Sequence, residues 1–392
     1  MDNKNSNKES NVEQVSVLSQ ITVYPVKSVA GIDMSTSWVE LQGLSFDRRF
    51  MLALPDGKMV TARQYPQMVK ITASLQADGI IFSYPDKSPL MLKYRDLQQQ
   101  QAQATVWNDS FTAYTTTEQA NLWFSEIIQQ PVSLLYSGEQ SNRVREKLGH
   151  NVSFADGYPM LLISQGSLNE LNRRSSDNHS MKQFRPNLVV NSDEPFVEDT
   201  WKRIKIGEVE FEVVKPCERC ILTTVDTTTA KFRTNKEPLA TLSRFRANPQ
   251  GAVFFGQNLV AKNEGVIKLD DVVEVLEYQQ PHRYPDQGIS KDLSNQSESG
   301  QSQIKSVVIT ANGVAVAGDN QSNLLEQLES AGLSIPYKCR SGMCGTCSVI
   351  LESGSVDQDE VPAATRARQK GLDSRTIFAC CAVPNQDIEI RY

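Results

Sequence analysis

The segment KPCERCILTTVD, residues 215–226, places Cys217 and Cys220 directly after a run with the pattern of a strand. In that run, residues 209–213, apolar side chains alternate with acidic ones, as in a strand with one buried face. We expect Pro216 to end the strand, because proline donates no hydrogen bond to a sheet. The two thiols are therefore predicted to lie at the end of a strand.

The chemistry of this segment comes from its two thiols and the cation between them, Arg219. A thiol close to a cation ionises more readily, and the thiolate is the form that binds metals. The segment can therefore supply a soft, negatively charged ligand. A Cys-x-x-Cys pair by itself is also compatible with a redox pair, half of a zinc site, or two small buried residues.

Composition predicts a folded protein of several domains. The 392 residues suggest about two to three domains, and an apolar content of 39% is enough for ordinary cores. The net charge of −6 argues against binding nucleic acid, which requires a basic face. No apolar run approaches the roughly 20 residues that span a bilayer, so we expect no membrane association and a cytoplasmic location. Residues 1–14, polar throughout except for Met and Val, are expected to form a disordered tail and not a signal peptide or anchor.

The cysteines indicate metal chemistry in a reducing compartment. An odd number in local groups, without a secretion signal, does not fit a disulfide framework. The three histidines lie far from any cysteine in the sequence, which argues against zinc sites built on histidine and against histidine-dependent catalytic triads. The seven cysteines are Cys217, Cys220, Cys339, Cys344, Cys347, Cys380 and Cys381.

The region before the central segment reads as short strands separated by turns, which predicts a β-rich barrel or sandwich. Residues 164–174 have the apolar spacing of an amphipathic helix, with Ser164 or Ser167 as its N-cap. Strands are expected at 15–24, 38–41, 68–75, 160–163, 253–255 and 272–276, a short helix at 121–129, a strand entry at 184–187, and a turn at 256–258.

The composition changes after residue 277, where a run rich in Ser, Gln, Asn, Asp and Gly predicts a linker with little to bury. A further domain begins near Lys305. It opens with a predicted hairpin of strands at 307–309 and 314–316, followed by a helix at 323–331 that Gly332 ends.

Cys339, Cys344 and Cys347 have the C-x4-C-x2-C spacing of plant-type 2Fe–2S ligation, in which the fourth thiolate lies far downstream. Small residues between them allow the loop to wrap closely around a cluster, and backbone N–H groups can then point at the sulfurs. A zinc knuckle is the alternative. Residues 305–392 resemble plant-type ferredoxins, in which the fourth ligand stands four positions before a proline. Cys380 meets that condition with Pro384, and Cys381 does not.

Cationic turns precede the central cysteines, and no glycine pattern for binding NAD, FAD or a P-loop phosphate is present. Arginine and lysine with serine and asparagine suit a phosphorylated anionic ligand, although each arginine alone also reads as a surface charge. Residues 15–278 resemble MOSC proteins with an N-terminal β-barrel domain, whose relatives are the mitochondrial amidoxime-reducing component and bacterial MOSC–ferredoxin fusions of the YcbX type. The matching pieces are YPVKS (24–28), DRRF (47–50), TARQ (61–64), FRPN (184–187) and CERCILTTVD (217–226).

The resemblance implies a mainly β fold with α+β parts in three domains. These are a MOSC N-terminal β-barrel domain at 15–115, a MOSC β-barrel domain at 116–278, and, after a linker at 279–304, a β-grasp ferredoxin domain at 305–392. It also implies a molybdenum cofactor, with Cys220 as the catalytic metal ligand and a 2Fe–2S cluster held by the four ferredoxin-type cysteines. The pterin- and phosphate-holding positions of the family match Lys27, Ser28, Arg49, Arg185, Asn187 and Arg219.

The implied activity is reduction of small N-hydroxylated compounds such as hydroxylamino bases and amidoximes. An NAD(P)H-dependent flavoprotein is expected to supply electrons through the cluster. The alternatives are a cofactor or sulfur carrier with a persulfide on Cys220, and a reductase of S-oxides. The resemblance assigns no role to Cys217, and Asp226 is followed by threonine where relatives often have proline.

Overall fold

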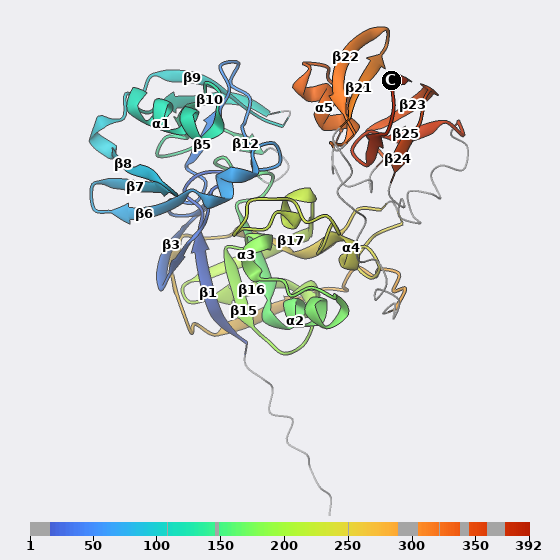
Figure 1. The fold of residues 1–392 in the computed structure, drawn as a ribbon. Coiled ribbons are helices and arrows are strands. Elements are labelled where there is room, and N and C mark those ends of the chain that lie inside the picture. Colours follow the sequence, from blue (N-terminus) through green and yellow to red (C-terminus); the bar gives the residue numbers. More distant parts are fainter. Residues whose placement is uncertain are drawn as a thin grey trace, which may run out of the picture.

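The computed structural model describes residues 16–107, 109–145, 149–249, 251–288, 305–320, 322–337, 345–358 and 373–392 (Figure 1). Strands account for 42% and helices for 15% of the fold, which confirms the predicted mainly β class with α+β parts. Within the described part of the chain, no helix is both long and apolar enough to cross a membrane.

A curled sheet of eight strands forms the centre of the molecule. Its apolar faces enclose a core in which large side chains such as Trp201 and Phe211 are almost fully buried. Neighbouring strands run antiparallel except for β14 (Met160–Ser164) and β15 (Leu188–Asn191), which are parallel. The helices α2 (Gln165–Arg174) and α3 (Met181–Phe184) connect them. In order across the sheet, the strands are β2 (Ile32–Met34), β1 (Val17–Val23), β15 (Leu188–Asn191), β14 (Met160–Ser164), β18 (Phe254–Ala261), β17 (Val209–Glu218), β16 (Trp201–Ile206) and β20 (Val273–Tyr278).

Helices and a small sheet surround the central sheet. Ser164, one of the two N-caps that the sequence allows, caps α2 by accepting a hydrogen bond from the backbone of Ser167. The elements are α2 (Gln165–Arg174), α3 (Met181–Phe184), α4 (Leu239–Leu242), the 3-10 turns η4 (Val197–Thr200) and η5 (Ile221–Thr224), and the sheet of β19 (Gly265–Lys268), β3 (Thr36–Glu40) and β4 (Gly43–Leu44).

The first two strands, β1 and β2, belong to the central sheet, and the elements of the N-terminal domain follow them in the sequence. Helix α1 (Glu118–Ile128) and strand β11 (Ser133–Tyr136) pack in the same hydrophobic cores as the strands before residue 115. The elements of this part of the fold are β5 (Phe50–Ala53), η1 (Pro66–Lys70), β6 (Thr72–Gln76), β7 (Gly79–Tyr84), β8 (Lys87–Lys93), η2 (Tyr94–Asp96), β9 (Gln101–Val106), β10 (Asp109–Thr115), α1 (Glu118–Ile128), β11 (Ser133–Tyr136), β12 (Val144–Arg145) and β13 (His150–Asn151).

Two local predictions in this part of the fold are wrong. The expected strand at 68–75 begins only at Thr72, because Pro66 starts a 3-10 turn that buries Met68. The expected turn at 256–258 lies inside β18. Gly256 has a φ of +77°, and a Cβ there would lie 2.8 Å from the carbonyl oxygen of Leu162, so the glycine marks a close approach between strands.

Pro216 does not end β17, contrary to the prediction. The strand continues to Glu218, and its pairing with β18 shifts between Val213 and Lys215 and again between Pro216 and Glu218. Proline is tolerated where the ladder is irregular, because no regular donor is needed there. Cys217 therefore lies within the strand, and Cys220 lies in the segment just after it.

The C-terminal domain has a five-stranded sheet covered by α5 (Figure 1). Leu324, Leu325 and Leu328 of this helix are buried in the same core as Cys347 and Cys380. The elements are β21 (Ser306–Ala311), β22 (Val314–Asp319), α5 (Leu324–Ser330), β23 (Ser348–Ser353), β24 (Val356–Gln358), β25 (Thr376–Phe378), β26 (Ala382–Pro384) and β27 (Ile388–Arg391).

The first part of the predicted linker packs on the central domain. The ring of Tyr284 stacks on Phe254 at 5.7 Å between centroids, and the guanidinium of Arg246 lies 4.5 Å from the Tyr284 ring. Arg174 donates to Asp286 at 2.9 Å. The rest of the predicted linker, residues 289–304, lies outside the described residues.

Candidate functional site

A pocket of about 170 Å³ opens where several strand ends of the central sheet meet the N-terminal domain. Lys27 and Ser28 come from the turn after β1, Arg185 and Asn187 from the connection between α3 and β15, and Cys220 from the segment after β17. Of the residues predicted for cofactor binding, the structure brings together Lys27, Ser28, Arg185, Asn187, Arg219 and Cys220. The other side chains discussed below that line the pocket are Arg48, Arg63, Asp156 and Cys217.

Each of the two central cysteines lies beside a different arginine. Nη1 of Arg63 donates to Sγ of Cys220 at 3.6 Å, and Nη1 of Arg219 donates to Sγ of Cys217 at 3.1 Å. Cys220 precedes the 3-10 turn η5, and its carbonyl accepts a hydrogen bond from the Thr223 hydroxyl at 3.0 Å. The thiol predicted to bind metal is therefore paired with Arg63 and not with its neighbour in the sequence.

An ion pair between a buried lysine and an exposed aspartate lies on the wall of the pocket next to Arg63. Nζ of Lys27 donates to Oδ1 of Asp156 at 2.6 Å and to the carbonyl of Phe154 at 2.9 Å. Burial lowers the pKa of Lys27 to about 8, although Asp156 partly offsets this effect. Partial loss of hydration in the pocket would raise the pKa of Asp156, but Lys27 and Arg63 outweigh this effect and hold that pKa below its ordinary value.

Tyr24 lies between two guanidinium groups at the edge of the pocket. The carbon Cζ of Arg48 lies 4.4 Å from the Tyr24 ring centre and that of Arg185 lies 4.2 Å from it. Burial raises the pKa of Tyr24 to about 12 despite these cations. Nη1 of Arg185 donates to the carbonyl of Val29 at 2.7 Å, which holds the guanidinium in place.

Arg49, a predicted cofactor residue, does not reach the pocket. It forms an ion pair with Glu40 and donates to the carbonyl of Glu139 at 2.8 Å. The neighbouring Arg48 lines the pocket instead and donates to the side chain of Asn187 at 2.9 Å. Arg48 has a φ of +48°, a left-handed conformation that no pattern of the sequence indicates.

Sequence reasoning also missed Arg63, Asp156 and Trp107 as parts of the site. Arg63 lies in the TARQ segment that carries the resemblance, and Asp156 precedes a fully apolar strand, so both had a weak signal. Trp107 had none. Its Nε1 donates to Asp156 at 3.1 Å, and its ring lies 4.4 Å from the Arg63 guanidinium carbon, so it holds both charged groups at the pocket.

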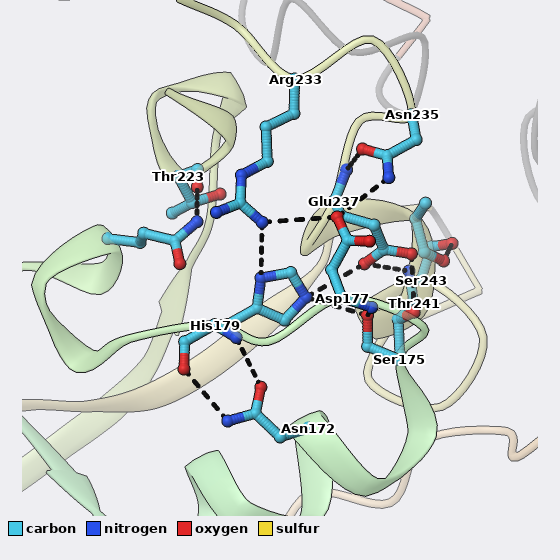
Figure 2. A network of polar contacts seen from close by, with 12 residues as sticks. Asn172, Ser175, Asp177, His179, Thr223, Arg233, Asn235, Glu237, Thr241 and Ser243 are labelled. Atoms are coloured by element: carbon cyan, nitrogen blue, oxygen red, sulfur yellow. Dashed lines mark hydrogen bonds and ion pairs between the residues drawn. The ribbon is translucent and has the colours of Figure 1, made fainter. Parts of the chain in front are cut away.

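A network of polar contacts supports the segment after Cys220 (Figure 2). Arg233 is at its centre: its backbone N–H donates to the carbonyl of Thr224 at 2.9 Å, and its guanidinium lies 3.5 Å from Asp226 and 3.3 Å from Nδ1 of His179. On the other side of the His179 ring, Nε2 lies 2.9 Å from the Ser175 hydroxyl. Through Arg233, these contacts connect η5 to His179 and, through His179, to Ser175 at the end of α2. Asp226 is paired with Arg233 in this network.

The described part of the predicted iron–sulfur site holds two thiols close together. Sγ of Cys347 lies 3.2 Å from Sγ of Cys380, and Cys381 lies 3.7 Å from Cys380. Cys339 and Cys344 lie outside the described residues, so these two predicted ligands are not placed. Among the residues that are described, no group of three or more His, Cys, Asp or Glu is arranged to hold a metal ion.

The pocket at Cys220 has the donor set that a phosphorylated, thiolate-bound metal cofactor requires. Nη2 of Arg185 and Nε of Arg219 are buried and have no hydrogen-bond partner in the described part of the chain. Buried cationic donors without a partner are costly, and an anionic ligand would satisfy them. The thiol of Cys220 supplies the soft ligand. The residues present therefore fit such a cofactor.

Family models match three successive parts of the chain. The MOSC N-terminal beta barrel domain model matches residues 15–131, the MOSC domain model matches 149–274, and the 2Fe-2S iron-sulfur cluster binding domain model matches 308–385. The Trichomonas vaginalis ferredoxin structure overlaps with 22% of this chain and 100% of its own, at 18% identity and a TM-score of 0.19.

The matches to curated relatives cover most of the length of each relative. Mitochondrial amidoxime reducing component 2 of Rattus norvegicus is 30% identical over 284 residues, which are 67% of this chain and 84% of the relative. The human protein of that name is 32% identical over 248 residues, 60% of this chain and 74% of the relative. These matches support a reductase with an iron–sulfur domain. The chain belongs to the MOSC family of the mitochondrial amidoxime-reducing components, and it carries a 2Fe–2S ferredoxin domain after the MOSC domain.

Proposed function

We propose that this protein is a molybdenum-cofactor-dependent reductase of N-hydroxylated compounds, such as hydroxylamino bases and amidoximes. The observation that carries the proposal is the partly exposed thiol of Cys220 in a pocket lined by lysine and arginine side chains, with Nη1 of Arg63 at 3.6 Å. The names of the relatives, amidoxime-reducing components, support this class of substrate.

Cys220 would bind the metal, and the buried cations would hold the phosphorylated pterin. Arg185 and Arg219 offer unpartnered donors, and Lys27 offers an ammonium group at one wall. When bound, the cofactor supplies the two-electron chemistry that removes an oxygen atom from nitrogen, while the protein orients and tunes it. The overall reaction consumes two electrons and two protons and converts R–NHOH to R–NH2 and water.

The ferredoxin domain provides the route for these electrons. A 2Fe–2S cluster carries one electron at a time, so two transfers serve each substrate molecule. The donor to the cluster is proposed to be an NAD(P)H-dependent flavoprotein, because the described residues of this chain show no nucleotide-binding glycine loop.

The test combines metal content with two matched variants. Protein from a host that makes the molybdenum cofactor should contain about one molybdenum and about two irons per chain. The Cys220→Ser variant should lose its molybdenum and its ability to reduce an amidoxime, and it should keep its iron. The Cys217→Ser variant should keep its molybdenum, its iron and its activity. Full activity of the Cys220→Ser variant, or a persulfide on Cys220 without any metal at that site, would contradict the proposal.

A further inference from the structure

A groove of about 600 Å³ separates the ferredoxin domain from the loop that carries Arg63. One wall is formed by residues 63–66 together with Phe232, and the other by the end of β22 and one face of α5. Figure 1 shows α5 on the side of its domain that faces the N-terminal domain. The groove therefore brings residues of the ferredoxin domain opposite residues that belong to the other two domains.

Two residues connect this groove to the Cys220 pocket. Arg63 lines both cavities, and its Nη1 contacts the thiol of Cys220 at 3.6 Å. Phe232 belongs to the short hairpin that follows Cys220, where it pairs with Val225 and is followed by Arg233 of the supporting network. The wall that faces the ferredoxin domain is therefore built from the same segments that hold the thiol.

The charges of the two walls are complementary. Asp319, Glu326 and Glu329 line the ferredoxin side, whereas Arg63, which also lies 3.8 Å from Asp156, is the charged residue among those that line the opposite side. Opposite charges steer two surfaces into one orientation and make their association sensitive to salt.

The acidic wall is also connected directly to a predicted cluster ligand. The backbone N–H of Leu325, in the first turn of α5, donates to the carbonyl of Ala379 at 2.9 Å. Ala379 precedes Cys380, whose thiol lies 3.2 Å from that of Cys347. One helix thus contacts the cluster-binding segment at its start and lines the groove along its exposed face.

We propose that the face formed by α5 and the end of β22 is the surface by which the ferredoxin domain docks on the Cys220 site, with Arg63 as the side chain that joins the docked face to the thiol. The role of this docking face in electron transfer rests on the proposed function. Each docking event would oxidise the reduced cluster by one electron and reduce the site at Cys220 by one electron. The covalent tether through residues 289–304 keeps the two surfaces at a high effective concentration, so a loose contact is sufficient.

Hydrogen–deuterium exchange of the full-length holoprotein tests the docking without any assay of activity. The variant Glu329→Lys reverses one charge of the acidic wall, and a cation suits this position near the C-terminal end of α5. The matched control is Glu389→Lys, an exposed residue of β27 in the same domain that does not line the groove. Glu329→Lys should raise exchange in peptides covering residues 63–66 and 231–233 about fivefold at low salt, because reversing a charge of the acidic wall weakens its attraction to the opposite wall. Glu389→Lys should leave these peptides unchanged.

A second measurement separates this inference from the proposed function. Reoxidation of the pre-reduced cluster by an amidoxime should be slower in Glu329→Lys and unchanged in Glu389→Lys. Equal exchange in wild type and Glu329→Lys at residues 63–66 and 231–233 would overturn the docking face. If exchange responds as expected but no amidoxime reoxidises the wild-type cluster, the docking face stands and the proposed substrate class fails.

Discussion

Nη1 of Arg63 lies 3.6 Å from Sγ of Cys220, although the two residues are 157 positions apart in the chain. Arg63 comes from the N-terminal domain and Cys220 from the end of a central strand. The contact therefore depends on how the two domains pack. Trp107 and Asp156 hold the guanidinium from the other side, at 4.4 Å from the ring centre and 3.8 Å from the carboxylate.

Arg63→Ala should weaken retention of the molybdenum cofactor. Hydrogen bonds to charged groups contribute about 1.5–3 kcal/mol, so affinity should fall about ten- to a hundredfold. Molybdenum content after dialysis measures this loss, and the iron content reports whether the ferredoxin domain is intact. Arg63→Lys should restore part of the loss because it keeps the charge without the planar fork. Full molybdenum content in Arg63→Ala would show that the contact with Cys220 has no role in binding.

Arg48→Ala and Arg49→Ala should have different effects, although the residues are adjacent. Arg48 lines the pocket, so its removal should lower cofactor content about tenfold or more, again by losing charge-assisted hydrogen bonds. Arg49 pairs with Glu40 away from the pocket, so its removal should lower the free energy of unfolding and leave the bound cofactor in place. Metal analysis and urea unfolding of both variants distinguish these results. The reverse pattern would favour the family-based assignment of Arg49 over the structure.

Lys27 should titrate near pH 8 in the cofactor-free protein. Its pKa is lowered by burial to about 8, so the side chain is positive below that pH and neutral above it. Affinity for an anionic ligand at this wall should therefore decrease as the pH rises through 8. Carbon-13 NMR of dimethylated lysines measures the midpoint. Lys58, whose pKa is raised by its hydrogen bond to Asp56, is the exposed control and should titrate above the ordinary range of lysine. A Lys27 midpoint equal to that of Lys58 would show that burial does not lower the pKa of Lys27.

Arg233→Ala should loosen the segment after Cys220. The guanidinium contacts Asp226, His179 and Asp177, so its loss leaves their polar groups poorly satisfied and should lower the free energy of unfolding by about 1–3 kcal/mol. Urea unfolding measures the change, and faster proteolysis within residues 221–233 would locate it. The control is Arg203→Ala, which removes a surface pair with Glu210 and should change stability by about 0.5 kcal/mol or less. Equal effects of the two substitutions would show that the network does not stabilise this segment.

Much of the secondary structure could be predicted because its signals are local. The apolar alternation before Cys217 predicts most of β17, and of the two serines that could cap α2 the structure uses Ser164. The predictions failed where tertiary contacts override local preference. Pro216 stays within a strand because β17 and β18 pair irregularly there. Gly256 is part of β18 and not of a turn, because its lack of a side chain allows the close approach of the Leu162 backbone.

The sequence by itself determined the chemistry that is encoded by spacing along the chain. The C-x4-C-x2-C run, the strand leading to Cys217 and Cys220, and the motifs at Lys27 and Arg185 are all read from neighbouring residues. Only the tertiary structure decided which arginine faces which thiol, and that Arg48 rather than Arg49 lines the pocket. The physical reason is that the direction of a side chain in an irregular turn, such as Arg48 at a φ of +48°, depends on backbone geometry and distant packing that no local pattern records.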